Sequence, residues 1–139
     1  MSAITAACCL IDALVDSGSF LRTQVSACDF GIMNNPPACA VIVRPSMSSF
    51  SYDYGYGGRR TWGWNVLGWI MDTADPEDVL SRIITMHDAL YGALTGGSIA
   101  NCASLTTRVR SISHDYSTIS QISGRDYWLV QAAVTTEES

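Results

Sequence analysis

The chain has 139 residues, of which 47% are hydrophobic and only 15% are charged, whereas soluble domains average roughly 25% charged residues. Thirteen acidic residues outnumber eight basic ones, all of them Arg, so the net charge is −5. The high apolar content and modest net charge exclude a disordered chain, and the shortage of cations argues against a protein that coats nucleic acid.

The length fits one domain, which we expect to span residues 1–139. No apolar run approaches the roughly 20 residues of a membrane span, and the N-terminal segment lacks the positive charge of a signal peptide. We therefore expect an intracellular origin. An odd number of cysteines without a C-x-x-C pair favours free, mostly buried thiols; these are Cys8, Cys9, Cys28, Cys39 and Cys102.

The first predicted element is a helix over residues 3–16. Apolar residues at spacings of 4, 3 and 4 form one stripe, which we expect to face the core: Ile4, Cys8, Ile11 and Val15. Ala7, Leu10 and Leu14 widen this stripe.

A connecting segment follows over residues 22–37, because Pro36 and Pro37 exclude a helix there. The continuous apolar run at 38–43 then predicts a short strand buried on both faces and closed by Pro45.

Residues 46–61 form the most unusual stretch of the chain. Aromatic residues alternate with Ser, Asp and Gly, which predicts a strand with an aromatic face: Phe50, Tyr52, Tyr54 and Tyr56. The Gly57–Gly58–Arg59–Arg60 run predicts the tip of an extended hairpin or a long loop.

Residues 61–72 predict the returning strand. Trp62, Trp64, Val66 and Ile70 share one face, and Leu67, Trp69 and Met71 share the other, so we expect both faces to be covered.

The second helix has the clearest signals. Asp75 is the expected N-cap, Pro76 stands at the first helical position, and Gly96 and Gly97 are expected to end the helix. Its apolar stripe consists of Val79, Ile83, Met86, Leu90 and Leu94. Leu80, Ile84 and Tyr91 flank that stripe.

The last third predicts two paired strands, at 104–117 and 126–136, joined by a turn over 118–125. Val109 and Ile112 break the alternation of the first strand, which indicates a bulge. The second strand is expected to present a core face of Trp128, Val130, Ala132 and Val134.

These elements predict an α+β fold in the order α-β-β-α-β-β. Two helices would pack on one face of a largely antiparallel four-stranded sheet, and an extended hairpin would project from it.

Motifs for chemistry are weak, so we expect no enzymatic activity, no cofactor and no metal. His87 and His114 are the two histidines, and a catalytic pair would need them to converge with a nucleophile. Helix capping explains Asp75, Glu77 and Asp78 better than metal binding does.

The aromatic hairpin is the strongest candidate for function. Aromatic residues and Arg are enriched in the centres of protein interfaces, so we expect a subunit or partner interface at Tyr52, Tyr54, Tyr56, Arg59 and Arg60. A hairpin that packs only on its own sheet, and stacking on single-stranded nucleic acid, are the alternatives.

The whole layout resembles the tail terminator, or tail completion, proteins of long-tailed bacteriophages. The resemblance rests on the Pro-containing approach NNPPACAVIV, the segment WNVLGWIMDTADPEDVLSRIITMHDALYGAL and the final RDYWLVQAAVTT, and it spans roughly residues 3–136.

The resemblance implies a structural virion protein assembled in the host cytoplasm. Such proteins form rings, usually hexameric, at the head-proximal end of the tail tube, where they end tube polymerisation and join the tail to the head connector. Viral DNA passes through the ring without sequence-specific binding, and no membrane is involved. Another neck adaptor or a head completion protein, and a small α+β ligand-binding or enzymatic domain, remain as alternatives.

Overall fold

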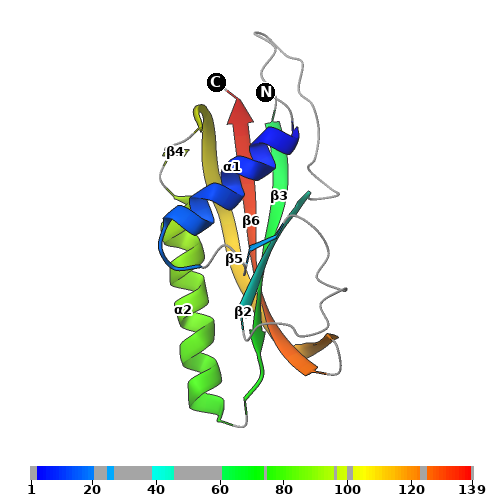
Figure 1. The fold of residues 1–139 in the computed structure, drawn as a ribbon. Helices are drawn as coiled ribbons and strands as arrows, with labels where there is room; N and C mark the ends of the chain where they lie inside the picture. The colour runs from blue at the N-terminus through cyan, green and yellow to red at the C-terminus, as the bar shows by residue number, and fades with distance from the viewer. Residues whose placement is uncertain are drawn as a thin grey trace.

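The computed structural model describes residues 3–20, 25–26, 39–45, 61–73, 75–95, 97–99, 102–122 and 125–138 (Figure 1). Its elements, in chain order, are α1 (Ala3–Asp16), β1 (Val25–Ser26), β2 (Cys39–Pro45), β3 (Thr61–Met71), α2 (Pro76–Leu94), β4 (Gly97–Ile99), β5 (Cys102–Ile122) and β6 (Arg125–Glu138).

The strands form one sheet in the order β1-β2-β3-β6-β5-β4. The four long strands, β2, β3, β6 and β5, are antiparallel neighbours, which confirms the predicted α+β class and the four-stranded antiparallel sheet. The short strands β1 and β4 extend this sheet at its two edges, β1 parallel to β2 and β4 antiparallel to β5. With two and three residues, they are too short to carry a periodic sequence pattern.

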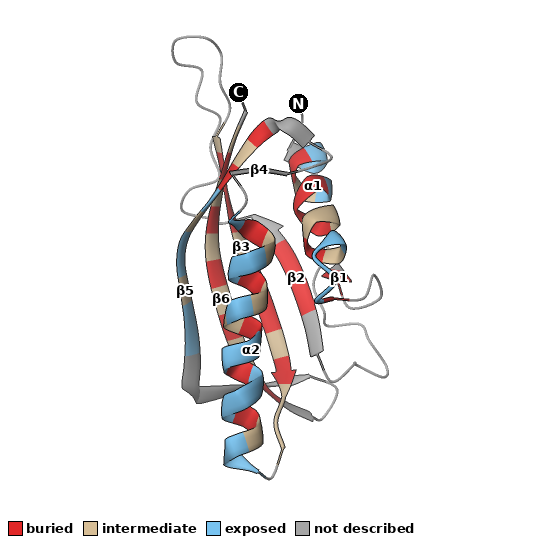
Figure 2. Cartoon of the chain, turned by 90° about the vertical axis from the view of Figure 1, so that its left-hand side faces the viewer, coloured by how far each residue is buried: buried red, intermediate tan, exposed pale blue. Residues whose placement is uncertain are grey.

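Both helices pack on the same face of the sheet, as predicted (Figure 2). α1 contacts β1 and β2, α2 lies mainly on β5 and β6, and the two helices also contact each other. Among the described residues, no helix is both long and apolar enough to cross a membrane.

The main core lies between the sheet and the helices, and alternating residues of each strand supply it. Trp62, Trp64 and Val66 of β3 point into this core, as their spacing predicts. On the opposite face, Ile42 and Leu67 are buried, and Trp69 and Leu129 pack against them. Both faces of β3 therefore carry the two residue sets expected from the sequence.

β3 and α2 approach each other most closely at Gly68. A Cβ atom built on this glycine would lie 2.7 Å from the Sδ atom of Met86 and 2.9 Å from its Cγ atom. Met86 is itself buried, so the glycine leaves the space that the methionine side chain fills.

α1 has the predicted bounds but turns a different face to the core. Its most deeply buried residues are Ala6, Cys9, Leu10 and Leu14. Of the predicted stripe, Ile11 is buried, but Ile4 is 78% exposed and Cys8 is also exposed. The prediction was wrong for Ile4 and Cys8, but it is confirmed for Ile11 and for the widening residues Leu10 and Leu14. α1 carries apolar residues around much of its circumference, and only packing against β1, β2 and α2 selects the inner side.

α2 follows its sequence signals closely. The side chain of Asp75 accepts a hydrogen bond of 3.0 Å from the backbone N–H of Glu77, and Pro76 begins the helix. All five residues of the predicted stripe are buried. The helix ends at Leu94, with Thr95 as its C-cap, and Gly97 already begins β4.

The closing pair of strands is longer than predicted. β5 continues to Ile122 and β6 begins at Arg125, so the prediction of a turn over 118–125 was wrong. The continuation was not predicted because residues 116–122 (YSTISQI) lack the apolar alternation that signals a strand. The predicted bulge is confirmed as a shift in register between Val109 and Ser111, and a second shift lies between Asp115 and Ser120.

Candidate interaction surface

The predicted hairpin interface lies outside the described residues. This applies to Tyr52, Tyr54, Tyr56, Arg59 and Arg60, and to the strand expected around them. The interface at these five residues therefore stays a prediction. The surface that the structure describes belongs to the other elements.

The most distinctive described surface is one side of α2. Leu80, Ile84 and Tyr91 are 46%, 52% and 60% exposed, although all three are large hydrophobic residues. With His87 they follow spacings of 4, 3 and 4, so the four side chains form one row, here called the flank stripe (Leu80, Ile84, His87 and Tyr91). At 100° per residue, this row lies about 90° around the helix from the buried stripe.

The flank stripe is not simply the solvent-facing side of α2. The side directly opposite the core carries polar residues, among them Ser81 and Asp88, which are exposed. The exposed apolar residues are displaced from that side toward β5, because His87 reaches His114 of β5. α2 therefore has an apolar flank in addition to its apolar inner face.

The two histidines meet between α2 and β5. His87 Nε2 and His114 Nδ1 are 2.8 Å apart, and the ring planes cross at 80°. At this distance the two nitrogen atoms form a hydrogen bond, in which one ring donates its N–H and the other ring accepts. Burial lowers the pKa of His87 below its ordinary value of 6.5, His114 lowers it further, and Asp88 raises it.

This pair predicts a loss of stability in acid. Because the folded state holds the pKa of His87 below 6.5, the unfolded chain binds more protons at this site as the pH falls below that value. We expect the melting temperature to fall between about pH 7 and pH 5, and to fall less steeply in His87→Gln. Thermal melts across this pH range measure both slopes, and equal slopes would contradict a lowered pKa of His87 in the folded state.

The edge strand β5 borders the flank stripe. β4 pairs with the outer side of β5 only between Cys102 and Thr107. Beyond that point, no described strand pairs with the outer side of residues 108–122, here called the free edge. Figure 2 shows β5 beside α2, with exposed residues on α2 and on the part of β5 whose burial is described.

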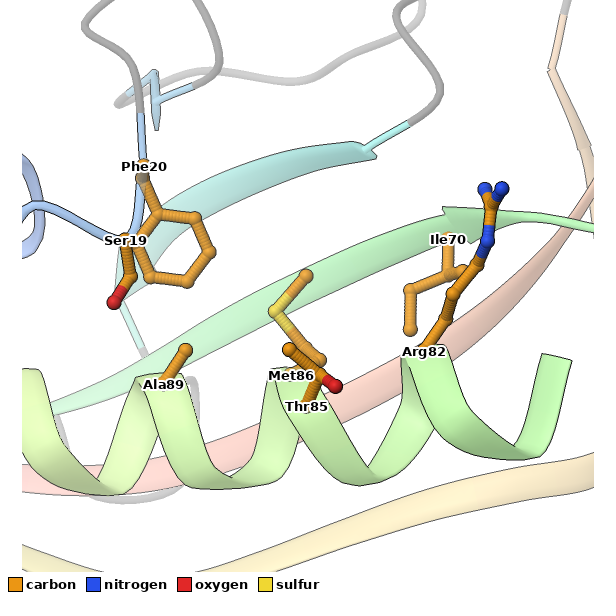
Figure 3. Close-up of a pocket in the computed structure, with 7 residues that line it drawn as sticks. All are labelled: Ser19, Phe20, Ile70, Arg82, Thr85, Met86 and Ala89. Carbon is orange, nitrogen blue, oxygen red and sulfur yellow. The ribbon is translucent and has the colours of Figure 1, made fainter. Parts of the chain in front are cut away.

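A cavity of about 410 Å³ opens on the other side of α2 (Figure 3). Phe20 stands at one end and Arg82 at the other, with Met86 between them. The remaining lining residues are Ser19, Ile70, Thr85 and Ala89. Among the lining residues that the structure describes, Arg82 is the one that carries a charge, and its Nε lies 3.1 Å from a carboxylate oxygen of Asp78. The described lining is therefore mainly apolar.

The acidic residues before and within the start of α2 have structural partners. Asp75 caps the helix, and Asp72 accepts a hydrogen bond of 3.0 Å from Trp128 Nε1. In the part of the chain that the structure describes, no three His, Cys, Asp or Glu side chains gather as metal ligands do.

Of the predicted free thiols, Cys9 differs from the prediction, whereas Cys8 is free as predicted but lies on the surface. Cys9 is disulfide-bonded, whereas Cys8 is a free and exposed thiol. The two neighbours point about 100° apart on α1, so one faces inward and the other faces solvent.

The sequence held only part of the signal for this surface. The sequence placed Leu80, Ile84 and Tyr91 beside the apolar stripe of α2, but it did not show that these three side chains stay exposed. The meeting of His87 and His114 had no local signal, since the two residues are 27 positions apart.

Comparison with models of known protein families finds no match, and comparison with curated proteins finds none either.

Proposed function

We propose that this chain is a non-enzymatic structural protein of a bacteriophage virion, similar to the tail terminators. It assembles as a ring, most simply a hexamer, at the head-proximal end of the tail tube, ends tube polymerisation and joins the tail to the head connector. The observation that carries the proposal is the layout of the fold, with its α-β-β-α-β-β order of principal elements and both helices on one face of an antiparallel sheet.

The exposed apolar residues support the proposal that neighbouring subunits or partners cover this protein. Ile4 of α1 and Leu80, Ile84 and Tyr91 of α2 leave large apolar side chains in solvent. Exposed apolar groups that gather on one element are typical of interaction surfaces. The low charge content of the chain agrees with this, because the centres of interfaces are depleted in charged residues.

The acidic balance suits a ring through which DNA passes. With a net charge of −5, the assembled copies repel the phosphate backbone, which keeps DNA from adhering to the lumen. Exposed acids in the described residues include Asp16, Asp75, Glu77 and Asp88.

Assembly of the purified chain tests the proposal. We expect negative-stain images and light scattering, recorded with and without tail tube protein, to show a ring with a central hole. The double substitution Arg59→Glu with Arg60→Glu is expected to abolish most assembly, because reversing two charges at an interface introduces repulsion. Far-UV circular dichroism should stay unchanged.

Arg82→Glu is the matched control, since Arg82 is an exposed arginine of α2 that lies outside the flank stripe and outside the predicted hairpin. A chain that stays monomeric with tube protein present would contradict the ring. Cross-linking to the portal rather than to tube protein would favour a neck adaptor or head completion protein. A monomer that a small molecule stabilises would favour a ligand-binding domain that uses the cavity beside Phe20.

A further inference from the structure

We propose that the free edge of β5 and the flank stripe of α2 together bind a second copy of this chain about a twofold axis. In this contact β5 pairs antiparallel with β5 of the second copy, and α2 packs against the second copy's α2. The contact does not depend on the proposed ring, since it uses residues other than the predicted hairpin.

The free edge requires an extended partner. An edge strand presents a row of backbone N–H and C=O groups that only another strand satisfies in regular fashion. β5 is 21 residues long, and β4 covers only its first part, through Thr107. The remaining backbone, residues 108–122, is long enough to pair with a strand of the same length.

The flank stripe requires a partner in the helix layer. Leu80, Ile84 and Tyr91 stand above the sheet, on the side of α2 from which His87 reaches β5. A single added strand would satisfy the edge but would leave these side chains in water. A partner that offers a strand with an amphipathic helix above it covers both, and this chain presents such a unit at this edge.

The spacing of the layers agrees with a twofold arrangement. Paired strands lie about 4.8 Å apart, so an axis beside β5 places the two β5 strands at that distance. Because α2 lies mainly over β5 and β6, the two α2 axes come to about 10 Å apart, which is a distance at which helices pack.

The middle of the free edge and the middle of the flank stripe also lie next to each other. The middle of the free edge is residue 115, and its neighbour His114 contacts His87, which lies near the middle of the flank stripe. One axis therefore passes through the centre of both features, and β4 of each copy stays clear of the other β5.

The test is sedimentation and light scattering of the full chain over a concentration series. We expect a reversible dimer, and we expect Ile84→Glu to raise its dissociation constant by about tenfold or more. Ile84 is 52% exposed, so the substitution should leave the fold intact, as circular dichroism would verify. Thr85→Glu is the matched control, because Thr85 is exposed on the opposite side of the helix and lines the cavity.

Two further measurements examine the strand pairing and the symmetry. Hydrogen exchange in residues 108–122 should slow as the concentration rises, because the outer amides become bonded. An equal mixture of Ile84→Glu and Ile84→Lys should dimerise although each variant alone is monomeric, since Ile84 lies near its own counterpart across the axis.

A monomer at every concentration, a dimer unaffected by Ile84→Glu, or a mixture that stays monomeric would overturn the inference. A chain that shows no dimer on its own, yet forms rings with tube protein, would overturn the inference while the proposed function stands. A dimer that Ile84→Glu disrupts, in a chain that never forms rings with tube protein, would support the inference and contradict the proposed function.

Discussion

The Leu90→Ala variant is expected to lose about 2–5 kcal/mol of unfolding free energy, the usual cost of removing a buried leucine side chain. Leu90 is fully buried in the C-terminal half of α2, where it belongs to the core between the helices and the sheet. The substitution removes apolar contacts and leaves a cavity that the paired strands and helices cannot fully close. Urea unfolding followed by circular dichroism, at one fixed protein concentration, measures the loss.

Leu80→Ala is the control, since it makes the same chemical change on the same helix. Leu80 is 46% exposed, so we expect its loss to stay within about 0.5 kcal/mol in the monomer. Similar losses for the two variants would contradict the orientation of α2 on the sheet, and with it the exposure of the flank stripe.

Gly68→Ala is expected to destabilise the protein by about 1–3 kcal/mol, even though Ala has the higher strand propensity. The new methyl group would lie 2.7 Å from Met86 Sδ, in a buried side chain that packs between α2 and β3 beside the cavity that it lines. Either the side chain or the helix must shift. Thermal and urea unfolding measure the cost.

A double-mutant cycle shows whether Met86 is the cause. Met86→Ala removes the Cγ, Sδ and Cε atoms that the new methyl group would meet. We expect the double variant Gly68→Ala with Met86→Ala to be more stable than the sum of the single losses predicts, by about 0.5–3 kcal/mol. Strict additivity would indicate that Gly68→Ala acts elsewhere, for example on the backbone of β3.

The elements with strong local signals were predictable from sequence. α2 has a capping residue, a proline at its first position and an unbroken apolar row, and each of these acts within a few residues along the chain. β3 was predictable for a similar reason, because large apolar residues on alternate positions specify its two faces.

Features that depend on distant residues were not predictable. α1 offers apolar residues on several sides, and the choice of Leu10 and Leu14 over Ile4 as inner residues follows from where β2 and α2 lie. β1 and β4 form because a neighbouring strand accepts their hydrogen bonds, not because of their own composition. The meeting of His87 with His114 likewise follows from the packing of α2 on β5.

The pairing of β3 with β6 has a consequence for synthesis. β3 pairs along its whole length, from Thr61 to Met71, with residues that the ribosome adds 56 to 76 positions later. Until β6 has emerged, β3 lacks one of its two neighbouring strands, and its buried tryptophans, Trp62 and Trp64, cannot complete their packing. A long loop must also close before the β3–β6 ladder forms. Assembly of the sheet is therefore a late event in translation, and a nascent chain that stalls within β5 presents these tryptophans to chaperones instead of to a core.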